Sequence, residues 1–340
     1  MSADIRPEPA VLVTGGAGYI GSHVALALLD AGYNVVVLDN LATGFASAVP
    51  SAATFRQGDI ADCQLVSQII HTHNIDSVIH LGGSLLVGES SVDPLKYFEN
   101  NVGGSSRFLR AAVKAGVRHV VFSSTAAVYG ETESQPVRED CPTEPINPYG
   151  TSKLIIEGVL AASSRAHDFN YSSLRYFNVA GADPSGRSGQ SSSEATHLIK
   201  VACEAACGKR EGVRIFGDDY DTPDGTCVRD FIHVSDLAAA HVDALERLRQ
   251  HPDEDLVLNC GYGHGYSVKE VLAAVERVSG YTFPQAVDAR RAGDPAALVA
   301  DNGKLLRTLP WRPRYDDLDL IVAHALNWER KLAGYTFEDA

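Results

Sequence analysis

A tyrosine and a lysine stand four residues apart in Pro148-Tyr-Gly-Thr-Ser-Lys153, where a predicted helix begins and runs to about Arg165. Side chains at this spacing share one face of a helix. A free phenol has a pKa of about 10, and a neighbouring cation lowers a pKa by about 1 to 3, toward the neutral range in which an acid/base works. Tyr149 is therefore a candidate acid/base, and Lys153 is the cation that lowers its pKa.

Such a pair also occurs by chance on solvated helix faces, so its context matters. The segment His119-Val-Val-Phe-Ser-Ser-Thr125 is predicted to be a strand that ends in hydroxyl side chains before the helix. The hydroxyl of Thr125 can hydrogen-bond a reacting substrate hydroxyl and pass on its proton. The predicted catalytic residues are therefore Thr125, Tyr149 and Lys153.

A glycine-rich turn near the start of the chain is typical of pyrophosphate binding. In Val11-Leu-Val-Thr-Gly-Gly-Ala-Gly-Tyr-Ile-Gly21 an apolar strand runs into a turn and then directly into a helix. Gly15, Gly18 and Gly21 allow a tight turn, close approach of backbone to phosphate and close helix packing. The alternative is an ordinary strand-to-helix turn.

An acid at the end of the next apolar run favours the dinucleotide interpretation. Asp39 closes Asn34-Val-Val-Val-Leu-Asp39 and follows Gly15 by 24 residues, near the spacing of about 20 at which a carboxylate binds an adenosine ribose. Its charge would repel a 2′-phosphate, so NAD is favoured over NADP, although Asp39 also suits the start of a loop. Lys153 would then hold the nicotinamide ribose as well.

Strands and helices alternate up to residue 178, which predicts an α/β fold with a doubly wound parallel sheet and ligands at the carboxyl ends of the strands. The Gly/Ser-rich segment 183–193 marks a change in character. We therefore expect a Rossmann dinucleotide-binding domain over 1–178 and a smaller mixed α/β substrate domain over 179–340. A segment at about 228–260 is expected to return to the first domain.

Composition narrows the function classes. The 340 residues are 45% hydrophobic and 21% charged, and the net charge of −14 argues against nucleic-acid or anionic-membrane partners. The six cysteines include no Cys-x-x-Cys pair and no metal-ligand spacing, which predicts reduced thiols in a cytoplasmic protein and no metal site. No apolar run reaches the roughly 18 residues that span a bilayer.

Several further polar or aromatic residues are candidate ligand contacts, each with a structural alternative. Arg229 and Arg291 are isolated cations that suit a diphosphate, or a salt bridge with the neighbouring acids. Phe216 could stack on a flat base or lie in the core. Asp59 could accept from an adenine amine or cap a helix. The amides at 100 and 101 indicate a ligand contact rather than a core role, with solvent exposure as the alternative for one of them. A hydroxyl-bearing substrate with a diphosphate end is expected.

Taken together, these motifs resemble the UDP-glucose (UDP-galactose) 4-epimerases of the extended short-chain dehydrogenase/reductase class, from about Val11 to Trp328. The resemblance rests on Thr14-Gly-Gly-Ala-Gly-Tyr-Ile-Gly-Ser22, Leu38-Asp-Asn40, Val87-Gly-Glu-Ser90, Asn100-Asn-Val102, Ser123-Ser-Thr-Ala-Ala-Val-Tyr-Gly130, Pro148-Tyr-Gly-Thr-Ser-Lys153, Arg175-Tyr-Phe-Asn178, Val228-Arg-Asp-Phe-Ile-His-Val234 and Arg290-Arg-Ala-Gly-Asp294.

The resemblance implies a tightly held NAD that oxidises C4 of a UDP-hexose, a 4-keto sugar that turns over, and return of the hydride to its other face. It also implies a homodimer through helices near 100–115 and 149–165. The residues and the resemblance together predict NAD contacts at Gly15, Gly18, Tyr19, Ile20, Gly21, Asp39, Asn40, Asp59, Ile60, Leu81, Gly82, Gly83, Asn100, Tyr149, Lys153 and Tyr176. The predicted substrate contacts are Thr125, Tyr149, Asn178, His197, Leu198, Phe216, Arg229, Arg291, Asp294 and Leu298.

Three positions depart from the family pattern. Leu81-Gly-Gly-Ser-Leu85 lacks a basic residue that family members often use to contact the cofactor, and Thr196-His197 replaces paired asparagines. Leu298 is intermediate in bulk at the position that sets room for an N-acetyl group, which leaves acceptance of UDP-N-acetylhexosamines open.

The predicted function is 4-epimerisation of UDP-galactose to UDP-glucose. The alternatives are another NDP-sugar epimerase, a nucleotide-sugar 4,6-dehydratase and a non-catalytic NAD-sensing protein. A nucleotide-sugar 4,6-dehydratase would need acids straight after the threonine, where Ala126 and Ala127 stand. A non-catalytic NAD-sensing protein would not need Thr125, Tyr149 and Lys153.

Overall fold

The structure is a computed structural model that describes residues 10–132, 134–192, 195–291 and 293–334. These residues form two compact units, each assembled from separate stretches of chain. Unit 1 takes its described residues from Met1–Ser124, Asn147–Leu174 and His241–Val257, and unit 2 from Thr125–Ile146, Arg175–Ala240 and Leu258–Ala340. The described residues of 125–146, predicted to belong to the first domain, thus lie in unit 2.

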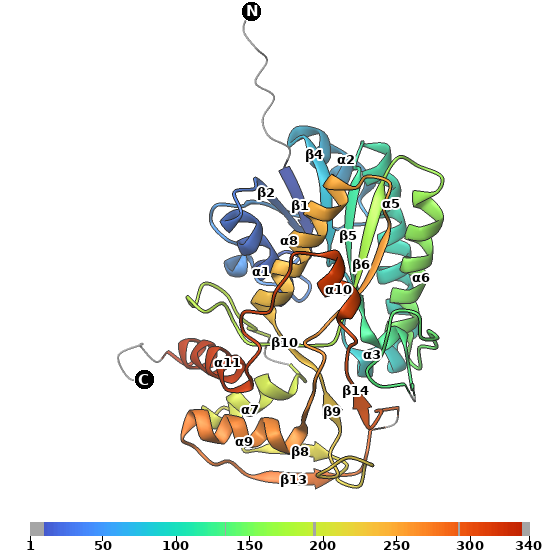
Figure 1. The fold of residues 1–340 in the computed structure, drawn as a ribbon. Coiled ribbons are helices and arrows are strands. Elements are labelled where there is room, and N and C mark those ends of the chain that lie inside the picture. Colours follow the sequence, from blue (N-terminus) through green and yellow to red (C-terminus); the bar gives the residue numbers. More distant parts are fainter. Residues whose placement is uncertain (1–9, 133, 193–194, 292, 335–340) are drawn as a thin grey trace, which may run out of the picture. The chain divides into compact units, whose positions relative to one another are not determined.

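A seven-stranded sheet with the order β11-β6-β5-β4-β1-β2-β3 is the main sheet of the described chain (Figure 1). From β1 the chain continues outward through β2 and β3, then crosses back to β4 and β5. The pairs β1–β2, β2–β3, β1–β4 and β4–β5 are all parallel. The predicted doubly wound parallel sheet is confirmed. Its strands are β1 Ala10–Thr14, β2 Val35–Asp39, β3 Thr54–Gln57, β4 Ile75–His80, β5 His119–Thr125, β6 Asn170–Tyr176 and β11 Leu256–Cys260.

Helices of unit 1 cover this sheet and supply its core. All five residues of β1 and of β2 are buried, as expected of a parallel sheet covered on both faces. Phe108 and Leu160 from the helices pack with Leu12, Val78 and Val120 from the strands. The helices are α1 Tyr19–Asp30, α2 Cys63–Thr72, α3 Val87–Val92, α4 Pro94–Tyr97, α5 Ser105–Lys114 and α6 Pro148–Ser164, with the 3-10 turn η1 Ala46–Ala48.

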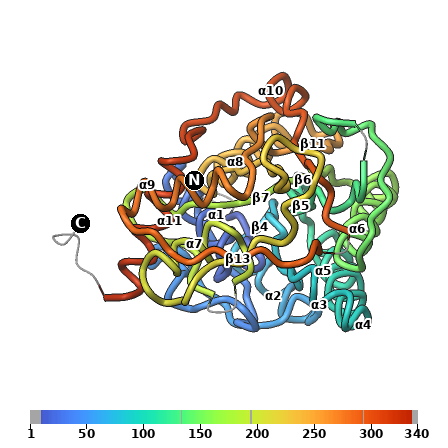
Figure 2. The backbone as a smooth tube through the Cα atoms, turned by 90° about the horizontal axis from the view of Figure 1, so that it is seen from below, coloured from blue at the N-terminus to red at the C-terminus, as the bar shows by residue number. Residues whose placement is uncertain are grey.

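The helical segment between β4 and β5 is divided into several parts. Asp93 caps α4 by accepting from the backbone N of Lys96, and Pro94 starts that helix. The next turns, η2 Phe98–Gly104, form a π-helix that continues into α5. Figure 2 shows α3, α4 and α5 grouped together. A π-helix often marks a functional site, because the extra residue redirects side chains.

Unit 2 contains three small sheets and a group of three helices that pack on one another, α7, α9 and α11 (Figure 1). β9 lies between β12 and β14, and β8 pairs in parallel with β13. Its elements are η3 Ala126–Val128, β7 Asn178–Ala180, α7 Leu198–Ala206, β8 Val213–Phe216, β9 Val228–Arg229, β10 Phe231–His233, β12 Tyr266–Ser267, α9 Val268–Ser279, β13 Gln285–Asp288, β14 Ala297–Leu298, α10 Gly303–Thr308 and α11 Leu318–Leu332, while α8 Val234–Gln250 is shared between the units.

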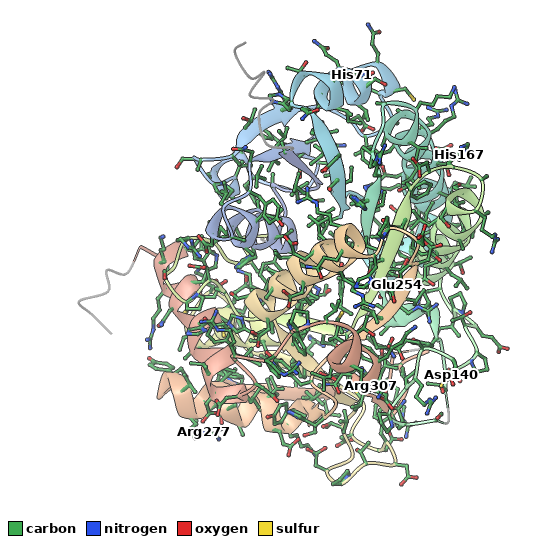
Figure 3. All side chains as sticks on the ribbon, turned by 45° about the horizontal axis from the view of Figure 1, so that its top comes forward. His71, Asp140, His167, Glu254, Arg277 and Arg307 are labelled. Carbon is green, nitrogen blue, oxygen red and sulfur yellow. The ribbon has the colours of Figure 1, made fainter. Side chains whose placement is uncertain are left out.

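Charged side chains lie mainly at the surface. Asp140 and Arg277, two of those labelled in Figure 3, have side chains 68% and 58% exposed. Among the helices of the described residues, none combines the length and apolar character needed to cross a bilayer.

Gly21 is predicted to tolerate no side chain. A Cβ there would lie 2.1 Å from the backbone O of Gly15, so Gly21→Ala must displace the turn. Overpacking of this kind should lower the free energy of unfolding by about 3 kcal/mol, measured by urea denaturation. Gly88→Ala is the control, because no described atom lies within 4 Å of its Cβ position. Equal stability of the two variants would contradict this account of the turn.

Candidate active site

The glycine turn has the shape and charge that a dinucleotide needs. Gly15 has a φ of 70°, which favours glycine, and α1 begins four residues later. The N-cap of α1, Gly18, has no side-chain cap among the described residues, and the first turn holds no acidic residue. Backbone N–H groups at such a helix start favour an anion. The turn therefore fits a pyrophosphate.

Asp39 is fixed beside this turn at the end of β2. Its Oδ2 accepts from the backbone N of Ala17 (3.0 Å), and its Oδ1 accepts from the backbone N of Leu41 (2.8 Å). The residue is 8% exposed. The carboxylate is thus oriented by backbone at the edge where an adenosine ribose is predicted to lie.

Three further predicted NAD contacts, Asn40, Asp59 and Ile60, follow β2 and β3 in the chain. Asn40 donates from Nδ2 to Oδ2 of Asp59 (3.0 Å), and Ile60 is buried. The alternative role of Asp59 as a helix cap is wrong, because Asp62 caps α2 by accepting from the backbone N of Gln64 and of Leu65. The contact of Asp59 with adenine stays a prediction.

The glycines after β4 pack directly on the glycine turn. A Cβ on Gly15 would lie 2.8 Å from the backbone N of Gly82, so the two backbones touch without room for a side chain. A Cβ on Gly83 would lie 2.9 Å from Oδ1 of Asn101 and 3.8 Å from Nζ of Lys153. The lysine therefore reaches the same loop that closes on the turn.

The two adjacent amides of η2 have different surroundings. Asn100 is half-buried and donates from Nδ2 to Oγ of Ser84 (2.9 Å). Asn101 is 2% exposed, accepts from the backbone N of Ser84 (2.7 Å) and donates to Oγ of Ser152 (3.0 Å). The expectation that Asn101 contacts a ligand is therefore wrong: it is a core residue that joins the loop after β4 to α6. The role of Asn100 stays a prediction.

Tyr149 and Lys153 lie close together at the start of α6, whose N-cap Asn147 accepts from the backbone N of Gly150. Lys153 is 6% exposed, donates to the carbonyl O of Ser123 (2.9 Å), and has its Nζ 5.9 Å from the centroid of the Tyr149 ring. Burial lowers the pKa of Lys153 to about 8. The lysine is thus a cation at neutral pH that loses its charge near pH 8.

Thr125 ends β5 and belongs to unit 2. It is 8% exposed, and its Oγ1 accepts from the backbone N of Ala127 (3.1 Å). Because this bond uses only a lone pair, the hydroxyl can still donate its proton. Ala126 and Ala127 lie in η3 directly after it and supply no acid or base.

Arginines and an aromatic ring gather at the small sheets of unit 2. Arg229 is paired with Leu298 in the register of β9 and β14, and its Nη2 lies 3.5 Å from Oδ1 of Asp294. The guanidinium carbon of Arg291 lies 3.8 Å from the centroid of the Phe216 ring. The salt-bridge alternative therefore holds for Arg229, whose bond to Asp294 is long. Phe216 is half-buried, and one face of its ring is covered by Arg291.

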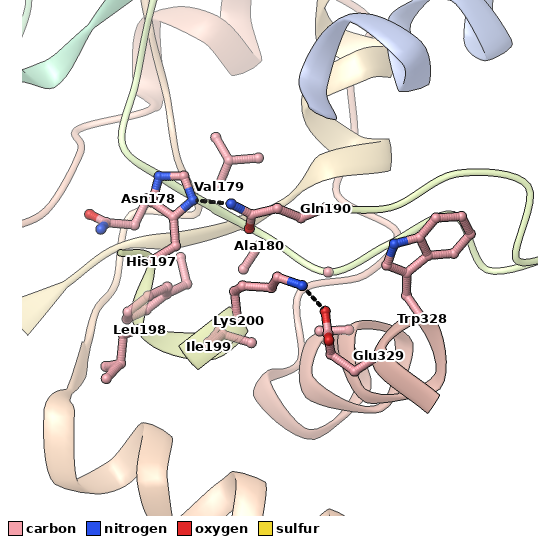
Figure 4. A pocket seen from close by; sticks show the side chains of 13 residues that line it. Asn178, Val179, Ala180, Gln190, His197, Leu198, Ile199, Lys200, Trp328 and Glu329 are labelled. Carbon is pink, nitrogen blue, oxygen red and sulfur yellow. Dashed lines mark hydrogen bonds and ion pairs between the residues drawn. The ribbon is translucent and has the colours of Figure 1, made fainter. Parts of the chain in front are cut away.

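Three further predicted substrate residues line one pocket of unit 2. Asn178, His197 and Leu198 lie around it together with Gln190 and Trp328 (Figure 4). The amide Nε2 of Gln190 lies 2.7 Å from Nδ1 of His197 and donates to it. Gln190 lines this pocket beside the predicted contacts. Sequence reasoning did not single it out, because its Ser/Gly-rich surroundings give no periodic signal. Tyr176, predicted to contact NAD, is half-buried at the end of β6.

Comparisons with known proteins identify the family of this chain. The model of the NAD dependent epimerase/dehydratase family matches residues 11–261. The chain is 53% identical to the UDP-glucose 4-epimerase of Azospirillum brasilense over 98% of this chain and 95% of that protein. It is 49% identical to that of Halalkalibacterium halodurans, over 97% of this chain and 98% of the other.

Solved structures give the same result. The UDP-glucose 4-epimerase from Stenotrophomonas maltophila with bound NAD and formylated UDP-arabinopyranose is 40% identical with a TM-score of 0.93, covering 96% of this chain and 99% of that one. The enzyme from Brucella ovis in complex with NAD is 45% identical with a TM-score of 0.91, covering 94% and 98%. The chain therefore belongs to the NAD dependent epimerase/dehydratase family, within its group of UDP-glucose 4-epimerases.

Proposed function

We propose that the protein interconverts UDP-galactose and UDP-glucose by NAD-dependent epimerisation at C4. The observation that carries this proposal is the meeting, inside unit 1, of a buried lysine with the loop that closes on the glycine turn. Nζ of Lys153 is 3.8 Å from the Cβ position of Gly83, and the adjacent Gly82 contacts Gly15. Lys153 of the predicted acid/base pair and the glycine turn predicted to bind the dinucleotide thus contact the same loop.

Tyr149 would take the proton from the 4-hydroxyl of the sugar and later return it. When bound, NAD supplies the group that takes hydrogen from C4 and gives it back on the other face, so no net redox change results. Lys153 favours the phenolate of Tyr149 electrostatically, because its ammonium lies one helical turn away. Thr125 would orient the same hydroxyl.

Unit 2 would hold the UDP part of the substrate. Arg229 and Arg291 offer planar donors that suit the oxygens of a diphosphate, and Phe216 offers a ring for the base. Asn178, His197 and Leu198 would contact the diphosphate-sugar end, since they share a pocket. The dehydratase alternative is weaker because Ala126 and Ala127 cannot move a proton.

We also propose a cytoplasmic homodimer. All six cysteines are free thiols, which is typical of a reducing compartment. In unit 1 the helices α3 and α4 pack on α6, and their apolar side chains Val92, Leu95 and Ile155 are 85%, 71% and 40% exposed. Apolar side chains gathered in this way favour a protein partner.

Turnover is the direct test of the proposed activity. The purified protein is expected to convert UDP-galactose to UDP-glucose without added NAD. Tyr149→Phe should lower kcat by about 10²- to 10⁴-fold while NAD stays bound, because only the proton transfer is removed. Tyr281→Phe, at a tyrosine 66% exposed, is the matched control and should keep full activity. Absence of turnover with every UDP-hexose would refute the assignment.

The buried lysine predicts a pH dependence of stability. Its pKa in the folded protein is about 8, below the usual 10.5, so between these values the unfolded chain binds more protons than the folded one. The free energy of unfolding of the NAD-free protein should therefore rise from pH 8 to 10.5, relative to Lys153→Met, by about 3 kcal/mol. Lys114→Met, at an exposed residue, should follow the wild type. Parallel curves for wild type and Lys153→Met would show that the lysine is not buried.

The dimer is tested by sedimentation. Leu95→Asp and Ile155→Asp place a charge on the proposed interface and should shift the protein toward monomer at micromolar concentration, because a desolvated carboxylate is costly. Val287→Asp is the control, since Val287 is also an exposed apolar residue, 51% exposed, but lies on β13 of unit 2. A wild-type monomer, or dissociation by the control alone, would contradict the proposed interface.

A further inference from the structure

We propose that His80 is a positioning residue for the cofactor, which fastens the glycine turn after β1 to the Gly82-Gly83 loop after β4. The proposal rests on the proposed function in one respect, that the turn binds the pyrophosphate of NAD. His80 itself is outside every set of predicted contacts. It acts through Thr14 and Ser105, and these three residues are called the His80 network.

The sheet places His80 beside Thr14. His80 ends β4, Thr14 ends β1, and the two are paired in the parallel register. Nδ1 of His80 lies 2.6 Å from Oγ1 of Thr14, and Nε2 lies 2.9 Å from Oγ of Ser105. Both ring nitrogens are therefore used, one toward the glycine turn and one toward α5.

Packing fixes the plane of the imidazole. His80 is 1% exposed. Its ring is stacked on Phe108 at 4.8 Å with an interplanar angle of 12°, and on Phe122 at 5.9 Å and 27°. A flat side chain that both donates and accepts hydrogen bonds in its own plane fits between these rings. A phenylalanine would stack in the same way, but the hydroxyls of Thr14 and Ser105 would lose their hydrogen-bond partners.

The His80 network contacts the backbone of the Gly82-Gly83 loop through Thr14. Oγ1 of Thr14 accepts from the backbone N of Gly82 (3.2 Å), and Thr14 directly precedes Gly15. Gly82 and Gly15 are the two residues whose backbones touch, so this hydroxyl holds the loop on the turn at their point of contact. Ser105 follows η2, which carries Asn100. Three predicted parts of the NAD site are thus linked through one ring.

The ring stays neutral while it does this. Burial, and next the positive charge of Lys153, lower the pKa of His80 to about 3. A neutral imidazole has one donor and one acceptor nitrogen, which matches two hydroxyl partners. It also adds no second cation beside Lys153. The role of His80 is therefore to hold backbone in place and not to carry a proton.

The test measures NAD affinity separately from catalysis, using full-length protein stripped of cofactor and titrated with NAD by calorimetry. His80→Phe should raise the Kd of NAD by about 10- to 100-fold, because buried hydroxyls lose their partner and the loop is released. His80→Gln, which keeps a donor and an acceptor, should restore much of that affinity. The kcat of His80→Phe should recover at saturating NAD, and its KM for UDP-galactose should match the wild type.

A second histidine of the same sheet serves as the control. His119 begins β5, at the opposite ends of the strands, and its Nδ1 lies 2.8 Å from Oδ1 of Asn170. His119→Phe is expected to lower the melting temperature without changing the Kd of NAD. A purely structural role of His80 predicts that both variants lose stability and neither loses NAD affinity, which would overturn the proposal.

Other variants allow the NAD affinity to be tested if His80→Phe does not fold. Thr14→Val removes the bond to Gly82 and should raise the Kd of NAD. His80→Leu, which lacks both ring nitrogens, should also raise it, and the double variant should raise it no further, since both changes act on one bond. Independent effects of the two, or a kcat that stays low at saturating NAD, would overturn the proposal. A wild type that binds NAD but turns over no UDP-hexose would refute the proposed function alone, because the NAD titration still decides the role of His80.

Discussion

The backbone contact between Gly15 and Gly82 is the constraint on which the rest of unit 1 depends. The ends of β1 and β4 meet there with no space for a side chain, so the loop after β4 must follow the glycine turn closely. Asn101 then anchors that loop to α6, and Lys153 of α6 reaches the glycine beside it. The predicted pyrophosphate position and Lys153 are therefore joined by one continuous set of contacts within unit 1.

Burial of Lys153 adds an electrostatic consequence to this geometry. Withdrawing the ammonium from water lowers its pKa to about 8 but leaves it charged at neutral pH, where it favours the phenolate form of Tyr149. The carbonyl of Ser123 partly offsets the desolvation by accepting a hydrogen bond. The hydrogen bond from Lys153 to Ser123 thus helps to keep the lysine charged and also holds it in place, because it joins α6 to β5.

Residue types and spacing were sufficient to locate features that depend on short, local offsets, whose functional roles stay predictions. The glycine turn, Asp39 and the pair Tyr149 and Lys153 are each defined by a strand end or a single helical turn, so residue types and offsets predict them. The doubly wound sheet followed for the same reason. The family is independently shown by the comparisons, which extend over nearly the whole chain.

Other features depend on contacts that sequence spacing does not contain. Asn100 and Asn101 are identical neighbours, and only the π-helix decides which of them faces the core. Asp59 and Asp62 both precede α2, and only the backbone geometry shows which one caps it. His80 ends an ordinary apolar strand, so its two hydroxyl partners, 66 and 25 residues away, were not foreseeable. The assignment of the segment 125–146 to unit 2 likewise depends on contacts between residues that are distant in the sequence.

The widened turns of η2 limit how this protein can change in length. Each residue of a helix rotates the following side chains by about 100°. Deleting one residue from Phe98–Gly104 would restore a regular coil, yet it would also swing Asn101 away from Ser84 or turn the buried face of α5 outward. Natural or engineered variation should therefore conserve the residue count of this segment more strictly than the identity of its exposed side chains.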